Sequence, residues 1–266
     1  MCDESEWGIR LLIICNAIGG LNNRLRCLVS CMRIDDDIKL VWPVKTSSVW
    51  LWCSFKDLFK NEFEEFKNKD ECVDKHSNLK IYSDYKFIRL NNEIDINHLV
   101  GDEVPDDIKY SVVKQIKKLK PVEYIDNKVE LFRKKFNKKT ITVSVRTYKD
   151  AGRNNAKNGI FFDITKIFDE MDKYSDCDFF VTCDHQDTFE EIFKKYPNRI
   201  IYTPKRTFFG DYKTVEGIQD SVIDLLLGGL NNHIIGTKGS SYCDMQWWFG
   251  GAKASVNYIN AHPGRK

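Results

Sequence analysis

The feature that most constrains the fold is a repeated alternation of short apolar runs with amphipathic segments. Residues 10–15 (RLLIIC) form a continuous apolar run, which is typical of a strand buried on both faces. Gly19 and Gly20 end that run. Apolar residues from 23 to 34 then have helical spacing, and residues 38–43 predict the next strand. Strand, glycine turn, helix and strand together predict a βαβ unit.

A second alternation of the same kind occupies the C-terminal half. Its predicted strands are residues 140–146, 177–182, 199–202 and 233–236. Its predicted helices are residues 163–173, 187–195, 218–227 and about 241–248. Such alternation favours parallel sheets with helices on both faces. We therefore expect an α/β fold with two Rossmann-like lobes and a cleft between them.

The middle of the chain is more charged and less periodic. It predicts a strand near residues 79–82 and helices at residues 55–67, 106–119 and 122–136. Pro121 precedes the last of these helices and marks a boundary, because proline interrupts regular structure. We therefore expect an N-terminal lobe of residues 1–121 and a C-terminal lobe of residues 122–266.

Composition excludes several classes of protein. The chain has 266 residues, and its 41 basic and 39 acidic residues are interleaved, so no basic face indicates a nucleic-acid binder. No apolar run approaches the ~18 residues of a membrane span. The acidic N-terminus lacks the pattern of a signal peptide. These features predict a soluble protein without a transmembrane segment.

The nine cysteines are spread singly and show no CxxC pair or Cys/His metal-ligand spacing. Several lie in apolar runs, where a thiol packs as a small hydrophobe. Residues 35–37 (DDD) lie between a predicted helix and a predicted strand, where we expect a solvated turn. We therefore expect a reduced, cytoplasmic protein with no metal ion and no cofactor. The sequence does not predict an oligomeric state.

The sequence Gly-Gly-Leu-Asn-Asn occurs twice, at residues 19–23 and 228–232. The first copy joins a strand to a helix N-terminus, an arrangement that favours bound phosphate. Asn22 and Asn23 tolerate left-handed backbone and carry side-chain hydrogen-bond donors, and Arg24 and Arg26 add cations nearby. The second copy follows an apolar helical run, so we interpret it as the turn that ends a helix.

Three further segments accompany the first copy: residues 144–150 (SVRTYKD), 220–227 (DSVIDLLL) and 234–241 (IIGTKGSS). They place an arginine at a strand end, a carboxylate in an apolar helix and a Gly/Ser turn before a helix. Together with residues 19–26 (GGLNNRLR), they resemble the GDP-fucose-dependent fucosyltransferases. That group includes α1,6-fucosyltransferases, nodulation-type bacterial enzymes and protein O-fucosyltransferases. Its pattern is a GGxGNR loop, an HxRxxD strand end and a late D…GTxxSS segment.

The resemblance covers residues 12–42 and 140–250 and implies a GT-B-like glycosyltransferase. It implies inverting, metal-independent transfer of fucose from GDP-fucose to a hydroxyl of a glycan or protein. The C-terminal lobe would bind the nucleotide sugar, and the N-terminal lobe would face the acceptor. The expected partners are therefore a nucleotide-sugar donor and a glycan or glycoprotein acceptor.

The resemblance also implies roles for matching residues. Arg146 would pair with the β-phosphate, and Asp224 would accept hydrogen bonds from N1–H and the amine of guanine. The implied nucleotide-sugar site consists of Gly19, Gly20, Asn22, Asn23, Arg24, Ser144, Arg146, Asp224, Gly239, Ser240 and Ser241.

The chain departs from the family pattern at three positions. Asn22 replaces the third glycine, and Ser144 replaces the histidine of HxR. Asp150 lies four residues after Arg146 rather than three. Asp150 and Asp184 are the candidates for the base that activates the acceptor hydroxyl. Together with Arg146 they form the predicted catalytic set.

Alternatives stay open at two levels. Arg146 could be a strand-end cation paired with Asp150 or Asp184, Asp224 an exposed helix residue, and Ser240 a helix cap. The chain could be a glycosyltransferase that uses another nucleotide sugar, such as a UDP-sugar. It could also be a non-catalytic module that binds nucleotide sugars or glycans, or an α/β interaction domain.

Overall fold

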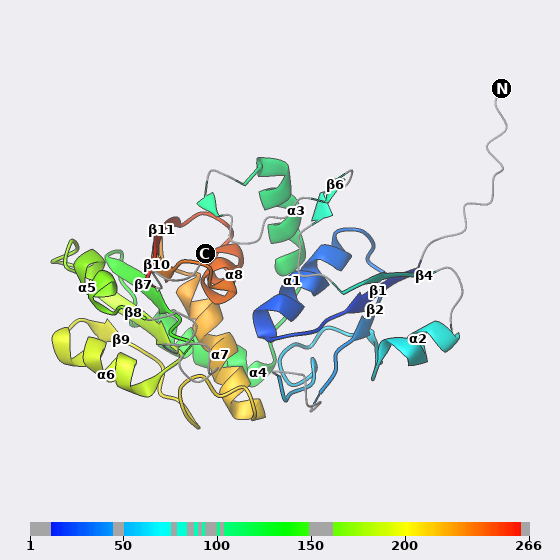
Figure 1. Ribbon diagram of the computed structural model, residues 1–266, viewed down its shortest axis with the longest axis horizontal. Helices are drawn as coiled ribbons and strands as arrows, with labels where there is room; N and C mark the ends of the chain where they lie inside the picture. The colour runs from blue at the N-terminus through cyan, green and yellow to red at the C-terminus, as the bar shows by residue number, and fades with distance from the viewer. Residues whose placement is uncertain are drawn as a thin grey trace.

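The computed structural model describes residues 12–44, 51–75, 79–83, 88–89, 92–93, 100–101, 104–148 and 162–261. Figure 1 shows two β-sheets on opposite sides of the molecule, with several helices between them. All strands of these two sheets pair in parallel. A small antiparallel pair, β5 (Ile88–Arg89) and β6 (Asn92–Glu93), is separate. The predicted α/β fold with two Rossmann-like sheets is confirmed.

The first sheet has the strand order β3–β2–β1–β4. Its strands are β1 (Leu12–Asn16), β2 (Ile38–Val41), β3 (Glu64–Phe66) and β4 (Leu79–Tyr82). β1 lies inside the sheet and its three central residues are buried, which explains its continuously apolar sequence. The helices of this half are α1 (Leu21–Met32), which follows β1 directly, and α2 (Lys69–Lys75).

The second sheet has the strand order β11–β10–β7–β8–β9. Its strands are β7 (Thr140–Val145), β8 (Asp178–Cys183), β9 (Ile200–Ile201), β10 (His233–Thr237) and β11 (Ser255–Ile259). Its helices are α5 (Thr165–Met171), α6 (Gln186–Lys195), α7 (Val215–Gly228) and α8 (Ser241–Phe249). All of these elements except β11 lie where the sequence predicts them, with their ends shifted by a few residues.

Helices join the two halves into one packed structure. The predicted helices α3 (Asp106–Ile116) and α4 (Glu123–Arg133) are confirmed. α4 packs on α7, and α8 contacts both α1 and α3. A single hydrophobic cluster contains side chains from both halves, among them Leu28, Val222 and Trp248. The two sheets therefore share a core.

A buried ion pair also crosses between the halves. Arg26 Nη2 on α1 lies 3.4 Å from Asp244 Oδ2 on α8, and both side chains are almost completely buried. The hydroxyl of Tyr258 on β11 also donates to Asp244. Removing one partner of a buried pair typically costs about 3–5 kcal/mol, because the other charge stays buried. This pair fixes α1 and α8 to each other.

The helix predicted at residues 55–67 is wrong. A turn occupies residues 56–58, and β3 follows. The backbone pairs with a distant segment instead: Lys60 N donates to Lys120 O (2.7 Å), and Val122 N donates to Leu58 O (3.0 Å). These tertiary hydrogen bonds satisfy groups that a helix would have paired locally.

The predicted lobe boundary, between residues 121 and 122, lies just before α4, within the stretch that bonds to residues 58 and 60. Pro121 forms a bridge with Phe59 of the first half, whereas α4 packs on α7 of the second half. The division into residues 1–121 and 122–266 stays a prediction. No disulfide joins the cysteines of the described residues. Within the same part of the chain, no helix combines the length and apolarity that a bilayer crossing requires.

The second Gly-Gly-Leu-Asn-Asn copy ends α7. Gly228 is the last helical residue and Gly229 is the C-cap. Both lie against α8: a Cβ on Gly228 would be 2.3 Å from Gln246 Nε2, and one on Gly229 would be 2.7 Å from Gln246 O. The interpretation of this copy as the turn that ends a helix is confirmed. Its glycines also allow close packing of two helices.

Candidate functional site

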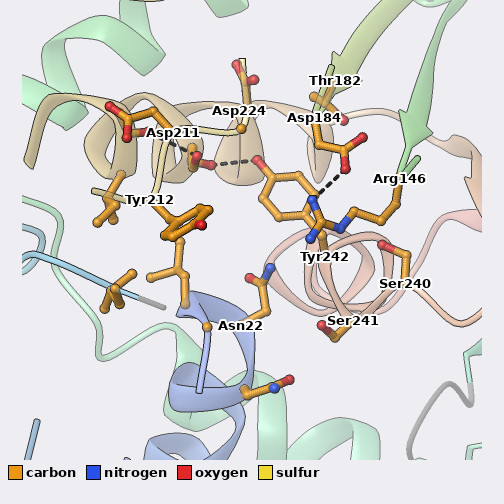
Figure 2. Close-up of a pocket in the computed structure, with 18 of the residues that line it drawn as sticks. Asn22, Arg146, Thr182, Asp184, Asp211, Tyr212, Asp224, Ser240, Ser241 and Tyr242 are labelled. Carbon is orange, nitrogen blue, oxygen red and sulfur yellow. Dashed lines mark hydrogen bonds and ion pairs between the residues drawn. The ribbon is translucent and has the colours of Figure 1, made fainter. Parts of the chain in front are cut away.

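A cavity of about 760 Å³ lies between the two halves (Figure 2). Its walls come from the carboxyl ends of β7, β8 and β10, the loop between β1 and α1, the segment after β9 and one face of α7. Ligands of open parallel sheets bind at the carboxyl ends of the strands. The volume lies within the range of about 300–1,000 Å³ that is usual for small-molecule sites.

All but two of the predicted site residues line this cavity. They are Gly19, Gly20, Asn22, Asn23, Ser144, Arg146, Asp184, Asp224, Gly239, Ser240 and Ser241. Asp150 lies outside the described residues. Arg24 is described, but it is not among the residues that line the cavity. The fold thus brings together segments that are up to about two hundred residues apart in the chain.

Arg24 stabilises the first glycine loop from behind. Its side chain is buried, and it donates to Gly19 O and to Pro43 O, both at 2.8 Å. The guanidinium lies 5.0 Å from the centre of the Trp42 ring. Burial lowers the pKa of Arg24 to about 10, so the side chain remains a cation at neutral pH. The position expected for Arg24 beside the ligand is therefore not observed.

The first Gly-Gly-Leu-Asn-Asn copy opens α1 toward the cavity. Gly19 has φ +82°, a conformation that favours glycine. Gly20 is the N-cap of α1 and has no side chain that could cap the helix. Asn22 points into the cavity (Figure 2). Its Oδ1 is buried and has no hydrogen-bond partner among the described residues. A buried acceptor of this kind is costly unless a ligand or water donates to it.

A second helix, α8, begins on another wall of the cavity. Its N-cap is Ser240, whose side chain makes no capping hydrogen bond. Ser240 therefore occupies the capping position that the alternative gave it, but its side chain does not cap the helix. The first-turn amides of a helix have no intrahelical acceptor and carry partial positive charge. Two helix N-termini from opposite halves thus face one cavity, which favours an anionic ligand.

Arg146, at the end of β7, is held by Asp184 at the end of β8. Arg146 Nη1 lies 2.5 Å from Asp184 Oδ2. The same carboxylate accepts from Thr147 N (2.7 Å) and Tyr148 N (3.1 Å). The Asp184 side chain is 8% exposed and that of Arg146 is 35% exposed. The pairing with Asp184 that the alternative interpretation of Arg146 gave is observed, and it leaves part of the guanidinium at the cavity.

Tyr148 has a backbone conformation that is rare for residues other than glycine, with φ 58°. Its hydroxyl donates to Gly239 O at 3.1 Å, and its ring centre lies 4.8 Å from the Arg146 guanidinium carbon. Tyr148 therefore connects the end of β7 to the turn before α8. Strained residues of this kind cluster at functional sites, because the surrounding structure must hold them there.

Asp224 on α7 is buried and belongs to a charged cluster. Its Oδ1 accepts from the Thr203 hydroxyl, and its Oδ2 pairs with Lys205 Nζ. Burial raises the pKa of the Asp224 carboxyl, an effect that Lys205 opposes. The alternative of an exposed helix residue is wrong. Asp224 and Lys205 both line the cavity and present an acceptor beside a donor.

Sequence analysis missed the wall formed after β9. This wall contains Lys205, Phe208, Gly210, Asp211 and Tyr212. Gly210 has φ +74°, and a Cβ there would lie 2.6 Å from the Asp184 carbonyl oxygen. Close packing therefore holds the segment against the Arg146–Asp184 pair. A glycine after two phenylalanines, at residues 208–210, is a weak signal for such a wall in the sequence.

No protein-family model matches the chain, and a search of curated proteins found no match. Solved structures do match. The α1,6-fucosyltransferase NodZ soaked with GDP-fucose has a TM-score of 0.59 at 11% identity, covering 90% of this chain and 92% of that one. The fucosyltransferase NodZ from Bradyrhizobium has a TM-score of 0.58 at 11% identity, with coverage of 89% and 92%.

POFUT1 in complex with GDP has a TM-score of 0.52 at 12% identity, covering 94% of this chain and 98% of that one. These TM-scores, over most of both chains, establish a shared fold although the identity is only 11–12%. The chain therefore has the two-sheet, GT-B-like fold of these fucosyltransferases.

Proposed function

We propose that this protein is an inverting, metal-independent glycosyltransferase that moves fucose from GDP-fucose to a hydroxyl of a glycan or protein. One observation carries the proposal: motif residues from four separate segments of the chain line a single cavity. The shared fold supports it, since structures with GDP and GDP-fucose are among those that match. The chemistry of each wall fits one part of the donor.

The diphosphate fits between the two helix N-termini and Arg146. An arginine offers a planar, permanently charged fork that matches phosphate oxygens. The amides at the start of α1 and α8 add donors on both sides. Asn22 Oδ1, whose partner is absent from the described residues, would accept from a hydroxyl of the sugar.

The guanine fits the Asp224–Lys205 cluster. The edge of guanine presents an acceptor, O6, next to two donors, N1–H and the exocyclic amine. Lys205 would donate to O6, and Asp224 would accept from the two donors. Ser144 occupies the position of the family's histidine. Lys205, on the neighbouring wall of the cavity, would supply a polar contact to the guanine in place of that histidine.

In the reaction, the bond between fucose and the diphosphate breaks while the acceptor hydroxyl attacks. The departing diphosphate gains negative charge, which Arg146 and the two helix ends would stabilise, as fixed dipoles and cations do in other sites. Attack from the opposite face of the sugar would invert the anomeric carbon. Asp184 acts here as a positioning residue for Arg146, since it pairs with Nη1 of that arginine and also accepts from the backbone amides of Thr147 and Tyr148. Asp150 remains the candidate base.

The remaining assignments are part of the same proposal. The acceptor would enter along the N-terminal lobe, and the lobe boundary would lie between residues 121 and 122. Ile18 and Phe208 are exposed at the cavity and offer apolar surface to a sugar ring. We place the reaction in the cytoplasm.

Release of GDP from GDP-fucose in the presence of an array of glycans and glycopeptides tests the function. Mass spectrometry of the array identifies a fucosylated product. We expect acceptor-dependent GDP release by the wild type and none by Arg146→Ala. A protein that binds GDP-fucose without any turnover would be a binding module, and one active only with a UDP-sugar would be a different glycosyltransferase. Either result would contradict the proposal.

A further inference from the structure

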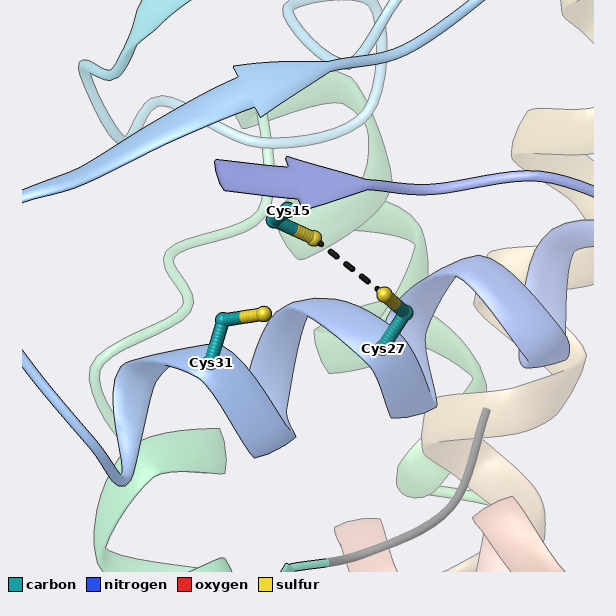
Figure 3. Close-up of side chains that lie close together, drawn as sticks. All are labelled: Cys15, Cys27 and Cys31. Carbon is teal, nitrogen blue, oxygen red and sulfur yellow. Dashed lines mark hydrogen bonds between the residues drawn. The ribbon is translucent and has the colours of Figure 1, made fainter. Parts of the chain in front are cut away.

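Three buried cysteines of the N-terminal half converge on one point. Cys15 lies on β1, and Cys27 and Cys31 lie one turn apart on α1; Figure 3 shows their thiols directed toward one another. The three sulfur atoms lie within 4.8 Å of each other, and those of Cys15 and Cys27 are 3.5 Å apart. All three side chains are at most 2% exposed.

A main-chain oxygen completes this group. The Tyr82 carbonyl oxygen on β4 lies 3.4 Å from the Cys27 sulfur. Tyr82 is also the partner of Cys15 in the sheet register, so it lies beside two members of the cluster. Three sulfurs and one oxygen are therefore contributed by three regular elements, β1, α1 and β4. Such elements hold ligands more rigidly than loops do.

These distances match a tetrahedral ion. With Zn–S bonds of about 2.3 Å and a Zn–O bond of about 2.1 Å, neighbouring sulfurs lie about 3.8 Å apart and sulfur and oxygen about 3.6 Å apart. The observed distances of 3.5 and 3.4 Å are already close to these values. The third sulfur, of Cys31, lies within 4.8 Å of the other two.

We propose that Cys15, Cys27 and Cys31, with the carbonyl oxygen of Tyr82, form a closed site for a thiophilic divalent ion of the Zn²⁺ type. Three sulfur ligands select such ions over Mg²⁺ and Ca²⁺, which take oxygen ligands. Each thiol loses its proton to solvent as it ligates, so three thiolates and Zn²⁺ leave one net negative charge. A monovalent ion would leave two net negative charges in the same buried place, and burying more charge costs more free energy.

The site would have a structural role. β1 and α1 are the two elements that the first glycine loop connects, so an ion between them would fix the geometry of that loop. The ion would lie behind the loop, since none of the three cysteines lines the cavity. It would therefore stabilise the fold without taking part in group transfer.

Metal titration of the reduced full-length chain tests this site. We expect one Zn²⁺ per chain and a visible absorption spectrum of tetrahedral thiolate coordination when Co²⁺ replaces Zn²⁺. Cys31→Ser should weaken Zn²⁺ binding at least about tenfold, because removing even a group that only hydrogen-bonds to a metal ligand typically costs that much affinity. Cys53→Ser is the matched control, because Cys53 is a buried cysteine of the same half outside the cluster.

Three results would overturn the site. The first is that the reduced wild type binds neither ion stoichiometrically. The second is that Cys31→Ser binds as tightly as the control variant. The third is a Cys15–Cys27 disulfide, without metal, in protein isolated in the absence of reductant, since that would make the cluster a redox pair. If Cys31→Ser does not fold, the Zn²⁺ stoichiometry and the Co²⁺ spectrum of the wild type decide the question.

Discussion

The two Gly-Gly-Leu-Asn-Asn copies are identical in sequence and opposite in use. The first begins α1 and lines the cavity, whereas the second ends α7 and does not line it. In the first copy Gly20 has no atom within 4 Å of its missing Cβ; in the second, Gly229 has backbone atoms at 2.7 Å. The first glycine pair leaves space for a ligand, and the second lets two helices touch.

The asparagines differ in the same way. Asn231 of the second copy donates to Thr142 Oγ1 at 2.9 Å and is satisfied within the fold. Asn22 of the first copy lines the cavity, and its buried Oδ1 has no partner in the described part of the chain. Which end of a helix the motif occupies therefore decides its role. Five residues alone carry no such information.

The largest expected effect comes from Gly229→Ala. The new Cβ would meet the backbone of Gln246 and Gly250, which cannot move aside as a side chain can. We expect the free energy of unfolding to fall by about 3 kcal/mol, as in overpacked cores. Urea denaturation measures it. GDP affinity of the folded variant should be unchanged, and unchanged stability would mean that the second copy does not serve helix packing.

Arg146→Lys tests whether the first Gly-Gly-Leu-Asn-Asn copy needs Arg146, on the opposite wall of the cavity, to bind GDP tightly. Lysine keeps a cation near Asp184 but loses the planar fork that matches phosphate. We expect GDP to bind about 30-fold more weakly, or about 2 kcal/mol, although the glycine loop is intact. Calorimetry measures the affinity. Wild-type affinity would show that Arg146 is only the structural partner of Asp184.

Gly20→Ala is the matched counterpart of Gly229→Ala. Its φ of −75° and the empty space around it accept a methyl group without strain. We expect unfolding free energy within about 0.5 kcal/mol of the wild type, but GDP affinity about tenfold lower because a methyl group blocks close backbone approach. If stability falls and affinity does not, the first copy is a structural turn like the second.

The asparagine pair gives the smallest effects. Asn231→Ala should cost about 1 kcal/mol of stability, since it removes a buried hydrogen bond. Asn22→Ala should leave stability unchanged and weaken GDP-fucose binding by about fivefold, or about 1 kcal/mol. Denaturation and calorimetry on both variants separate these outcomes. Equal effects of the two substitutions on binding would contradict the distinction between the copies.

Much of the fold follows from local patterns in the sequence. The apolar run of β1 and the helical spacing of α7 reflect burial, which the residue types record directly. The helix prediction for residues 55–67 was wrong because the backbone of this segment bonds to residues 120 and 122, a contact that no local pattern encodes. β11 was missed although its sequence, SVNYI, alternates apolar and polar residues.

The site was predictable only where a motif marked it. Arg146 and Asp224, which the motifs marked, both line the cavity, but nothing in the sequence indicated Lys205 or the unusual backbone of Tyr148. Arg24 carries the right charge on the wrong face of α1, since residue type does not fix side-chain direction. The cysteine cluster was invisible for a related reason: its ligands come from separate elements that meet only in the fold.

The central claim is that the cavity binds a guanine nucleotide, and calorimetric titration with GDP, UDP and ADP, without added metal, tests it most directly. We predict one GDP site per chain, weaker binding of UDP and ADP, and loss of the preference for GDP in Asp224→Asn. No binding of any nucleotide, or tighter binding of UDP than of GDP, would contradict the account.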